Sequence, residues 1–355
     1  MCRACPYVHA RIAVNMPQQV SCGIILITIN KTTPMERCFI RKRLFVLALL
    51  LITGNLLLAQ TDQDAIMMSK HNFCTGLMYG HSNWDHYWEG TYKRDNLNLG
   101  TVSTNSYAVM GNYGITDHLN FLFGVPYIQT KASAGTLHGQ KGIQDLSVWL
   151  KWLAAEKTFG KHDLSLYLLG GFSTPLSNYT ADFLPMSIGL HSTTFSGRLM
   201  LDYQHGGFFA TGSATYIYRN DITIDRTAYY TTTQVQSNKV DMPDMAAFSL
   251  RTGYRSHPLI AEAVVTNMQT LGGFDIRKND MPFPSNKMNA TTIGINGKYE
   301  IAKIDGLSLT GGANYVMAGR NVGQATSYNL GVFYIIAFHP KKEHSNQKPS
   351  HDTSK

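Results

Sequence analysis

Charged and amide side chains stand at alternate positions within otherwise apolar segments of this chain. In "DLSVWLKWL", residues 145–153, Lys151 is flanked by Leu150 and Trp152. The full set of such residues is Lys151, Arg198, Asp202, Arg251, Arg255, Asn296, Lys298 and Glu300. Charged side chains that line a passage select by charge which solutes go through. The sequence also allows a second interpretation, in which these groups pair with one another and fill a closed interior.

A second group of residues that could bind a metal or ligand lies in "GHSNWDHYWEGTYKRDN", residues 80–96. It brings His81, Asp85, His86 and Glu89 close together in sequence. A metal ion would need their ligand atoms to converge to about 2.0–2.2 Å, which spacing alone does not provide. We predict instead the end of a strand among interfacial aromatic rings, followed by a polar loop, with no metal and no cofactor.

Nucleophilic catalysis has little support in the sequence. A serine nucleophile needs a histidine base within hydrogen-bond reach. His81 and Ser82 are adjacent, so on a strand their side chains point to opposite faces. His191 and Thr193 have the spacing of one face, but they lie in a predicted loop and threonine replaces serine. We therefore predict no catalytic residues and no enzymatic activity.

The front of the chain has the features of a secretory signal peptide. A basic stretch over residues 37–43 precedes an apolar run over residues 44–59, which ends in Ala59. The run is shorter than the roughly 20 residues that a transmembrane helix needs. We predict a signal peptide over residues 35–59, cleaved near Ala59. Residues 1–34 are interpreted as an over-extended start, with a cytoplasmic extension as the alternative.

Most of the net charge of the chain lies in this leader. The chain has 31 Lys and Arg residues against 23 Asp and Glu residues, a formal net charge of +8. Seven of these basic residues and one acid precede Gln60, the predicted first mature residue, which leaves 24 against 22, or +2. Four of the five cysteines also precede it, so Cys74 has no intrachain disulfide partner. A nearly neutral mature chain gives no support to nucleic-acid binding.

Alternation of apolar and polar residues continues from residue 71 to residue 338. Twelve segments of about 10 to 14 residues show it, each long enough for a tilted strand to cross a bilayer. They start near residues 72, 104, 119, 145, 163, 194, 208, 247, 259, 290, 307 and 328. Large apolar side chains such as Phe121 and Phe123 share one face, which we expect to contact lipid. Charges on that face would cost a few kcal/mol each, so we expect the polar face to line a lumen.

The connections between these segments alternate in length. The tight breaks are at residues 116–118, 205–207, 256–258 and 304–306, and one medium break covers residues 155–163. The long polar connections cover residues 85–101, 132–144, 175–193, 221–245, 271–288 and 319–327. This layout predicts an all-β fold, a transmembrane antiparallel β-barrel of about 12 strands of outer-membrane type, with periplasmic turns and extracellular loops. We expect the barrel over residues 60–338 and a disordered periplasmic tail over residues 339–355.

Aromatic residues near the predicted strand ends suit the two interfacial girdles of such a barrel. They are Tyr79, Trp84, Trp88, Tyr127, Trp152, Tyr203, Tyr254, Tyr299, Tyr315 and Tyr334.

Three segments carry a family resemblance: "YGITDHLNFLFGVPY" (residues 113–127), "GIQDLSVWLKW" (residues 142–152) and "LSLYLLGGFSTP" (residues 164–175). They are similar to the outer-membrane barrel family named after the MetA pathway of phenol degradation. Its members share a strand-turn-strand "YG-(I/L)-TD-x-L" and a strand start "G-x-x-D-L-S". The resemblance covers residues 105–180 and implies an outer-membrane channel or transporter without catalytic residues.

The expected function is passage of small, apolar or amphipathic solutes across the outer membrane, with lipid and the solute as partners. The apolar character of the cargo rests on the resemblance. The alternative is a non-conducting barrel that acts as a binding or assembly scaffold through its extracellular loops. Trp149, Tyr167 and Leu169, which the alternation places inward, favour a partly filled lumen or an apolar binding patch. The sequence leaves the oligomeric state open.

Overall fold

The computed structural model describes residues 61–278 and 280–338 of the chain. The predicted leader and the predicted tail lie outside these residues. Twelve long antiparallel strands form one sheet. They are β1 (Asn72–Trp84), β4 (Val102–Thr116), β5 (Leu119–Ala132), β7 (Asp145–Phe159), β8 (His162–Pro175), β9 (Thr194–His205), β10 (Phe208–Arg219), β15 (Met245–Ser256), β16 (Leu259–Thr270), β17 (Asn289–Glu300), β18 (Leu307–Arg320) and β19 (Thr326–Ala337). No helix in the described part of the chain is long and apolar enough to span a membrane.

The sheet closes on itself, because each long strand pairs with its neighbours in sequence and the first pairs with the last. Asn72 of β1 lies opposite Ala337 of β19, and Asn83 opposite Thr326. Closure gives every strand a partner on both sides, as a sheet in lipid requires. The prediction of a twelve-stranded barrel is confirmed, and each strand begins within two residues of the start that alternation indicated.

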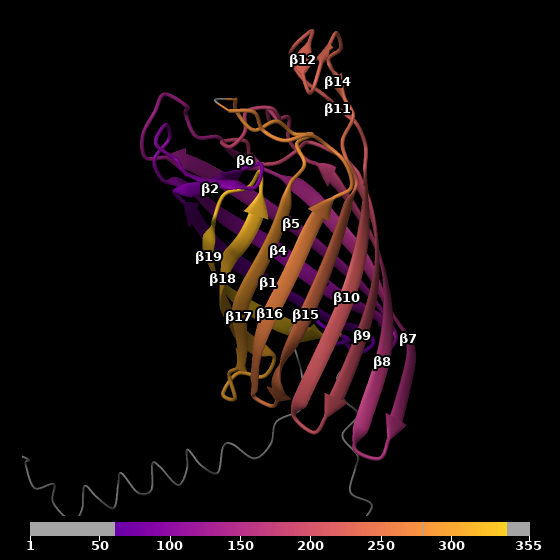
Figure 1. Ribbon diagram of the computed structural model, residues 1–355. Helices are drawn as coiled ribbons and strands as arrows, with labels where there is room; N and C mark the ends of the chain where they lie inside the picture. Colours follow the sequence, from indigo (N-terminus) through magenta and orange to yellow (C-terminus); the bar gives the residue numbers. More distant parts are fainter. Residues whose placement is uncertain (1–60, 279, 339–355) are drawn as a thin grey trace, which may run out of the picture. The chain divides into compact units, whose positions relative to one another are not determined.

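Short connections gather at one end of the barrel, the turn end, and long ones at the other, the loop end (Figure 1). Gly206 has a φ of +59°, a left-handed conformation that suits glycine, in the turn between β9 and β10. The medium break predicted over residues 155–163 was wrong. Strands β7 and β8 continue through it until Phe159 pairs with His162, and Gly160 at φ +66° takes the two-residue turn.

The loops at the loop end contain short strands of their own. These are β2 (His86–Glu89), β3 (Tyr92–Asp95), β6 (Lys141–Ile143), β11 (Ile222–Thr223), β12 (Tyr229–Tyr230), β13 (Gln234–Val235) and β14 (Lys239–Val240). Figure 1 shows β11, β12 and β14 rising above the rest of the barrel. An apolar cluster of Ile222, Val240, Met242 and Phe283 packs this segment against its neighbouring loops.

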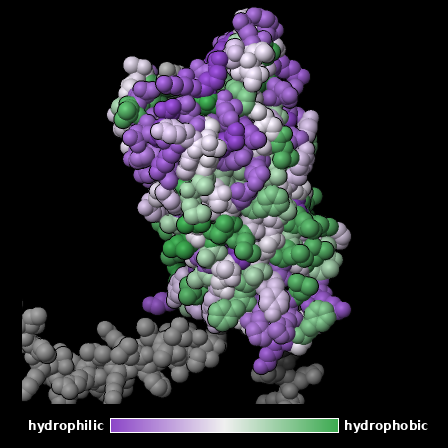
Figure 2. All heavy atoms as spheres, in the orientation of Figure 1, coloured by the Kyte–Doolittle hydropathy of each residue, from purple (hydrophilic) through white to green (hydrophobic). Residues whose placement is uncertain are grey.

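The outer surface of the barrel carries an apolar band. Phe121 is exposed, as alternation predicted, and further exposed apolar side chains include Leu77, Leu150, Phe195, Leu201, Leu250, Ile295, Leu330 and Val332. Figure 2 shows hydrophobic residues over the lower half of the strands, below a hydrophilic loop end. A soluble monomer rarely exposes so much contiguous apolar surface, whereas a lipid-facing wall requires it.

Exposed tyrosines lie toward both ends of this band. Tyr79 and Tyr315 lie toward the loop end, and Tyr254 and Tyr299 toward the turn end. The girdle prediction was wrong for Trp84 and Trp88. Trp88 is buried, and Trp84 packs against the apolar cluster of Leu99, Val102 and Met186 under the loops. Both belong to a buried core among the loops, and the alternation of residues along strands does not predict which residues form it.

Candidate functional site in the barrel interior

The predicted set of charged and amide residues lies on the inner face of the barrel wall. Lys151 is fully buried, and Arg198, Asp202 and Glu300 are buried. Arg251, Arg255, Asn296 and Lys298 line an interior cavity. The wall therefore carries both signs of charge on its inner surface, and the partners of each charge decide what the interior can do.

A segment that precedes the first strand fills part of the interior. We call residues 61–70 the plug segment. It joins the barrel at the turn end, where the Lys70 amide donates to Asp117 Oδ1 over 2.9 Å. The next amide, of His71, donates to the carbonyl of Gly114 over 2.8 Å. From there the segment rises inside the barrel, and Met68 packs with Cys74 and Phe333 in a buried cluster.

Lys151 holds the plug segment through its ammonium group. Nζ donates to the carbonyls of Asp64 and Ile66 over 2.6 and 2.8 Å, and to that of Thr61 over 3.1 Å. It also pairs with Asp64 Oδ1 at 3.1 Å. An ammonium group has three donors and tolerates burial only when they are satisfied and its charge is paired. The plug segment supplies both conditions, so Lys151 anchors this segment and does not present a free charge to the lumen. We call these contacts of Lys151 the latch.

The segment is shaped around this latch by a local turn. The Asp64 carboxylate accepts hydrogen bonds from the Thr61 amide at 2.6 Å and from the Ile66 amide at 3.1 Å. Bonds of this kind from an aspartate to nearby backbone amides fix a compact turn. The turn directs three backbone carbonyls toward Lys151.

Arg198 of β9 provides a second attachment for the plug segment, two strands away from Lys151 of β7. Its Nη1 donates to the Asp62 carbonyl over 2.6 Å and pairs with Asp62 Oδ2 at 3.1 Å. Its Nε donates to Thr215 over 2.8 Å, and its guanidinium lies 4.7 Å from the centre of the Trp149 ring. The Tyr167 hydroxyl adds a bond to the carbonyl of Ala65 at 2.9 Å. The plug segment is thus bound to the wall formed by β7, β8 and β9.

On the opposite wall, formed by β15, β16 and β17, the charges pair without help from the plug segment, one of them with Asp202 of β9. Arg251 meets Glu262 at 3.2 Å, and Lys298 meets Glu300 at 3.5 Å. Arg255 meets Asp202 at 3.0 Å, and its guanidinium lies 4.1 Å from the centre of a phenylalanine ring on β10. With the two pairs to the plug segment, these make five ion pairs, so the charges named here balance.

A cavity of about 430 Å³ lies between the plug segment and this opposite wall. Its apolar lining includes Ile66, Met78, Phe209, Ile260 and Val264, and its polar lining includes Arg251, Arg255, Glu262, Asn296, Lys298 and Asn314. Its volume lies in the range of sites that bind small molecules. A few charged and amide groups set in an apolar wall suit a solute with both characters.

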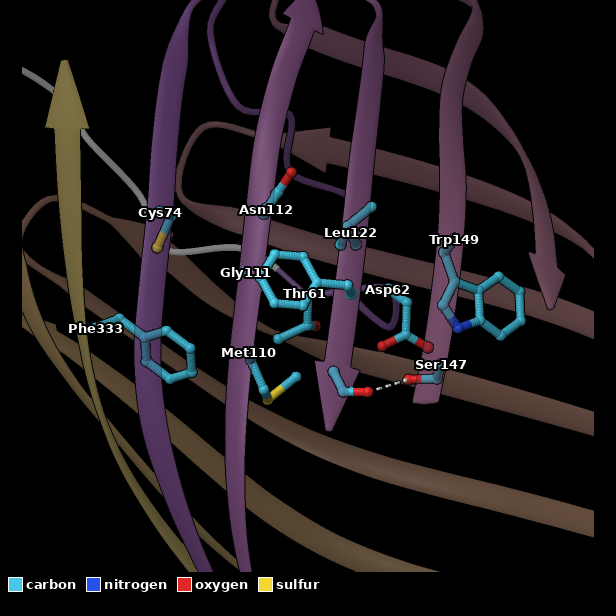
Figure 3. Close-up of a pocket in the computed structure, with 12 residues that line it drawn as sticks. Thr61, Asp62, Cys74, Met110, Gly111, Asn112, Leu122, Ser147, Trp149 and Phe333 are labelled. Carbon is cyan, nitrogen blue, oxygen red and sulfur yellow. Dashed lines mark hydrogen bonds between the residues drawn. The ribbon is translucent and has the colours of Figure 1, made fainter. Parts of the chain in front are cut away.

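Two further spaces lie inside the barrel beside this cavity. A chamber of about 330 Å³ lies under the loops and reaches down to Trp149. A pocket of only about 30 Å³ lies between the two and shares Trp149 with the chamber and Thr61 and Asp62 with the cavity. Figure 3 shows Thr61 and Asp62 in this pocket, among residues of β1, β4, β5, β7 and β19. The tip of the plug segment, Thr61 and Asp62, therefore borders both the cavity and this narrow pocket, which we call the constriction.

A set of polar contacts, which we call the clamp, joins the loops at the loop end of the barrel. Arg320 binds Asp275 through two hydrogen bonds, at 2.7 and 2.5 Å. Asn321 donates to Asp275 over 2.8 Å and to the carbonyl of Lys287 over 2.7 Å, and accepts from the Gly90 amide at 2.7 Å. The hydrogen bonds from Arg320 lower the pKa of Asp275 below its ordinary value. Two loops, the one that holds Gly90 and the one between β16 and β17, are thereby tied to the end of β18.

The other sequence candidates do not converge. His81 bonds to Asn105 at 2.8 Å, whereas His86 lies 2.6 Å from Asp85, and Glu89 pairs with an arginine of β3 at 2.7 Å. Within residues 61–278 and 280–338, no group of three or more His, Cys, Asp or Glu residues is arranged to hold a metal ion.

Alternation along strands did not reveal Asp62, Asp64 or Glu262 as interior residues. The first two precede the first strand in "TDQDAIMMSK", a segment with no strand period. Two closely spaced acids directly after the predicted cleavage site were the available signal. Glu262 stands in a strand whose alternation is clear, on the inner face beside Arg251 of the neighbouring strand β15.

Comparison with solved structures identifies similar folds. The chain is similar to the COG4313 outer membrane channel from Pseudomonas putida F1, with a TM-score of 0.61 and 13% identity, over 78% of this chain and 100% of that one. The NanC porin gives a TM-score of 0.41 at 10% identity, over 73% and 98% of the two chains. The TodX monoaromatic hydrocarbon channel deltaS2 mutant gives 0.38 at 11%, over 77% and 91%. No family model and no curated protein matches the sequence. The first likeness establishes the fold alone.

Proposed function

We propose that this barrel lies in the outer membrane and passes small amphipathic solutes through its interior. The cavity of about 430 Å³ between the plug segment and the β15–β19 wall carries this proposal. It lies inside a closed barrel whose outer surface is apolar, and it shares Thr61 and Asp62 with the constriction, which in turn shares Trp149 with the chamber under the loops. A solid interior would have filled this space with side chains, as small barrels do when they only need stability.

The lining of the cavity favours a solute with an apolar part and a polar part. Phe209, Ile260 and Val264 offer apolar surface, whereas Asn296 and Asn314 offer amide groups that donate and accept hydrogen bonds. The arginines and Lys298 are already paired, so a passing solute meets little net charge. A fully hydrated ion would lose water without gaining equivalent contacts from such a wall. An amphipathic molecule replaces part of its lost hydration with hydrogen bonds to the amides and contacts with the apolar side chains.

Two further observations support passage through this barrel. The protein from Pseudomonas putida F1 with the same fold is described as an outer membrane channel. The resemblance of residues 105–180 to the family named after the MetA pathway of phenol degradation favours a cargo with apolar character. The basic stretch over residues 37–43 and the apolar run over residues 44–59 support the proposal that a signal peptide delivers the chain to the outer membrane.

Adjacent valines on β16 provide the test of this function. Val264 lines the cavity, whereas Val265 is exposed on the outer face. We expect purified barrel in liposomes to admit phenyl glucoside, a solute with one apolar and one polar part. Val264→Trp should reduce the uptake rate toward that of protein-free liposomes, because the indole fills the cavity. Val265→Trp should leave it unchanged, because the same indole enters lipid.

The result that contradicts the proposal is equally specific. Absence of phenyl glucoside uptake by wild-type barrel, shown to be folded by its resistance to unfolding in detergent, would exclude passage of such solutes. The non-conducting scaffold would then be the better account of the fold.

A further inference from the structure

Two cations of the barrel wall are paired with carboxylates of the chain's own plug segment. Lys151 pairs with Asp64 and Arg198 pairs with Asp62, both at 3.1 Å. The other three interior ion pairs join groups of the barrel wall to each other. Lys151 and Arg198 are therefore wall cations whose counter-ions come from a segment outside the wall.

The surroundings of these cations have the character of a binding site for an organic acid. The ammonium of Lys151 lies 5.7 Å from the centre of the Tyr167 ring, and the guanidinium of Arg198 lies 4.7 Å from that of Trp149. Leu153, Leu169 and Met200 complete a buried apolar cluster here, together with Tyr167 and an alanine of the plug segment. Two cations beside aromatic rings and aliphatic side chains match a carboxylate joined to an apolar body.

The position of this site places it on the path of a solute. Trp149 borders the chamber under the loops, and Asp62 borders the main cavity. The pocket of about 30 Å³, which is too small for an organic solute, shares lining residues with both. A solute that moves from chamber to cavity through this pocket would have to displace the tip of the plug segment from Arg198.

We propose that Lys151 and Arg198 form a binding site for carboxylates that bear an aromatic or other apolar group, and that Asp62 and Asp64 occupy this site in its resting state. The plug segment then acts as a resident competitor. An arriving carboxylate replaces Asp62 at Arg198, stacks its apolar part against Trp149, and opens the constriction. This inference rests on the proposed function, and it names a class of solute that the channel selects.

The charge balance of the interior supports such an exchange. The five ion pairs of the resting state leave no net charge among these groups. When Asp62 and Asp64 withdraw, the wall retains two cations without counter-ions. A neutral solute does not replace the lost carboxylates, whereas an organic anion does, so displacement is more favourable for an organic anion than for a neutral solute such as phenyl glucoside.

Equilibrium binding tests the site independently of transport. Calorimetry on detergent-solubilised protein would measure the dissociation constant of benzoate, with benzamide as the neutral ligand of the same shape. The double variant Asp62→Asn and Asp64→Asn removes the competing charges and keeps side-chain size. It should bind benzoate at least about ten-fold more tightly than wild type, a difference that corresponds to ~1.4 kcal/mol. Benzamide binding should not change, and Asp163→Asn at the turn end should leave both ligands unaffected.

A further substitution confirms where the ligand binds. Adding Arg198→Met to the double variant should abolish the gain in benzoate affinity. If the double variant does not fold, Asp62→Asn alone provides the same comparison, because it leaves the turn at Asp64 intact.

Equal affinities of wild type and variants for benzoate, or equal gains for benzoate and benzamide, would overturn the proposal. Failure of the proposed function gives a different pattern, namely no phenyl glucoside uptake by any folded variant.

Discussion

Lys151 illustrates how far residue-level reasoning from the sequence extends. Alternation in "DLSVWLKWL" put its side chain opposite the exposed Leu150 and Trp152, and the structure places it fully buried inside the barrel. Alternation could not provide its partners. Those come from three carbonyls and a carboxylate of a segment without a strand period, and they become neighbours only when the barrel closes.

Replacing Lys151 should release the plug segment while the barrel stays intact. In Lys151→Met, three carbonyls and Asp64 lose their common donor inside the barrel. Breaking a buried ion pair costs ~3–5 kcal/mol, so amide exchange in residues 61–70 should become faster by at least about 100-fold. Exchange in the strands should change little, since their ladders do not depend on the plug segment.

Hydrogen exchange with mass spectrometry measures both regions in one experiment. Lys157→Met, an exposed lysine near the turn end of β7, is the matched control and should leave exchange unchanged. Unaltered protection of residues 61–70 in Lys151→Met would show that the latch does not hold the segment.

At the scale of elements, strands were more predictable than loops. The strand starts agree with alternation because each strand has one face in lipid and one inside, which imposes a strict period of two. The segment over residues 155–163 was predicted as a break because Glu156 and Lys157 interrupt the apolar pattern. Strands that project beyond the membrane no longer need an apolar face, so the strand continues through these charged residues. The short strands of the loops and the burial of Trp88 depend on loop-to-loop packing, which leaves no period in the sequence.

The clamp at Asp275 should survive moderate acidification. Its folded pKa is lower than its ordinary value of 3.8, chiefly because it accepts hydrogen bonds from Arg320. A carboxylate with a depressed folded pKa contributes stability above its unfolded pKa, and that stability is lost only as the pH falls through the folded pKa. The loop over residues 274–287 should therefore keep the same protection between pH 7 and pH 5.

Protection factors corrected for the intrinsic exchange rate at each pH measure this directly. Loss of protection in that loop at pH 5, with the strands unchanged, would show that another group with a higher pKa controls the clamp.

At the scale of the whole molecule, the sequence predicted the closed barrel but left its interior undecided. Apolar alternation and connection length follow from the membrane alone, so they determine the architecture. Whether the lumen is open or filled depends on where the segment before β1 goes. The structure gives an intermediate answer: the plug segment covers one wall, and a cavity remains along the other.

The central claim is that the interior is a passage which the plug segment restricts. Single-channel conductance of the chain lacking residues 61–68, compared with wild type in the same bilayer, tests it most directly. Removal of the plug segment should give larger current steps, because the constriction at Thr61 and Asp62 disappears. The steps should also favour anions over cations, because Lys151 and Arg198 lose their counter-ions. Current steps equal to those of wild type in size and ion preference, from protein shown to be folded, would contradict the account.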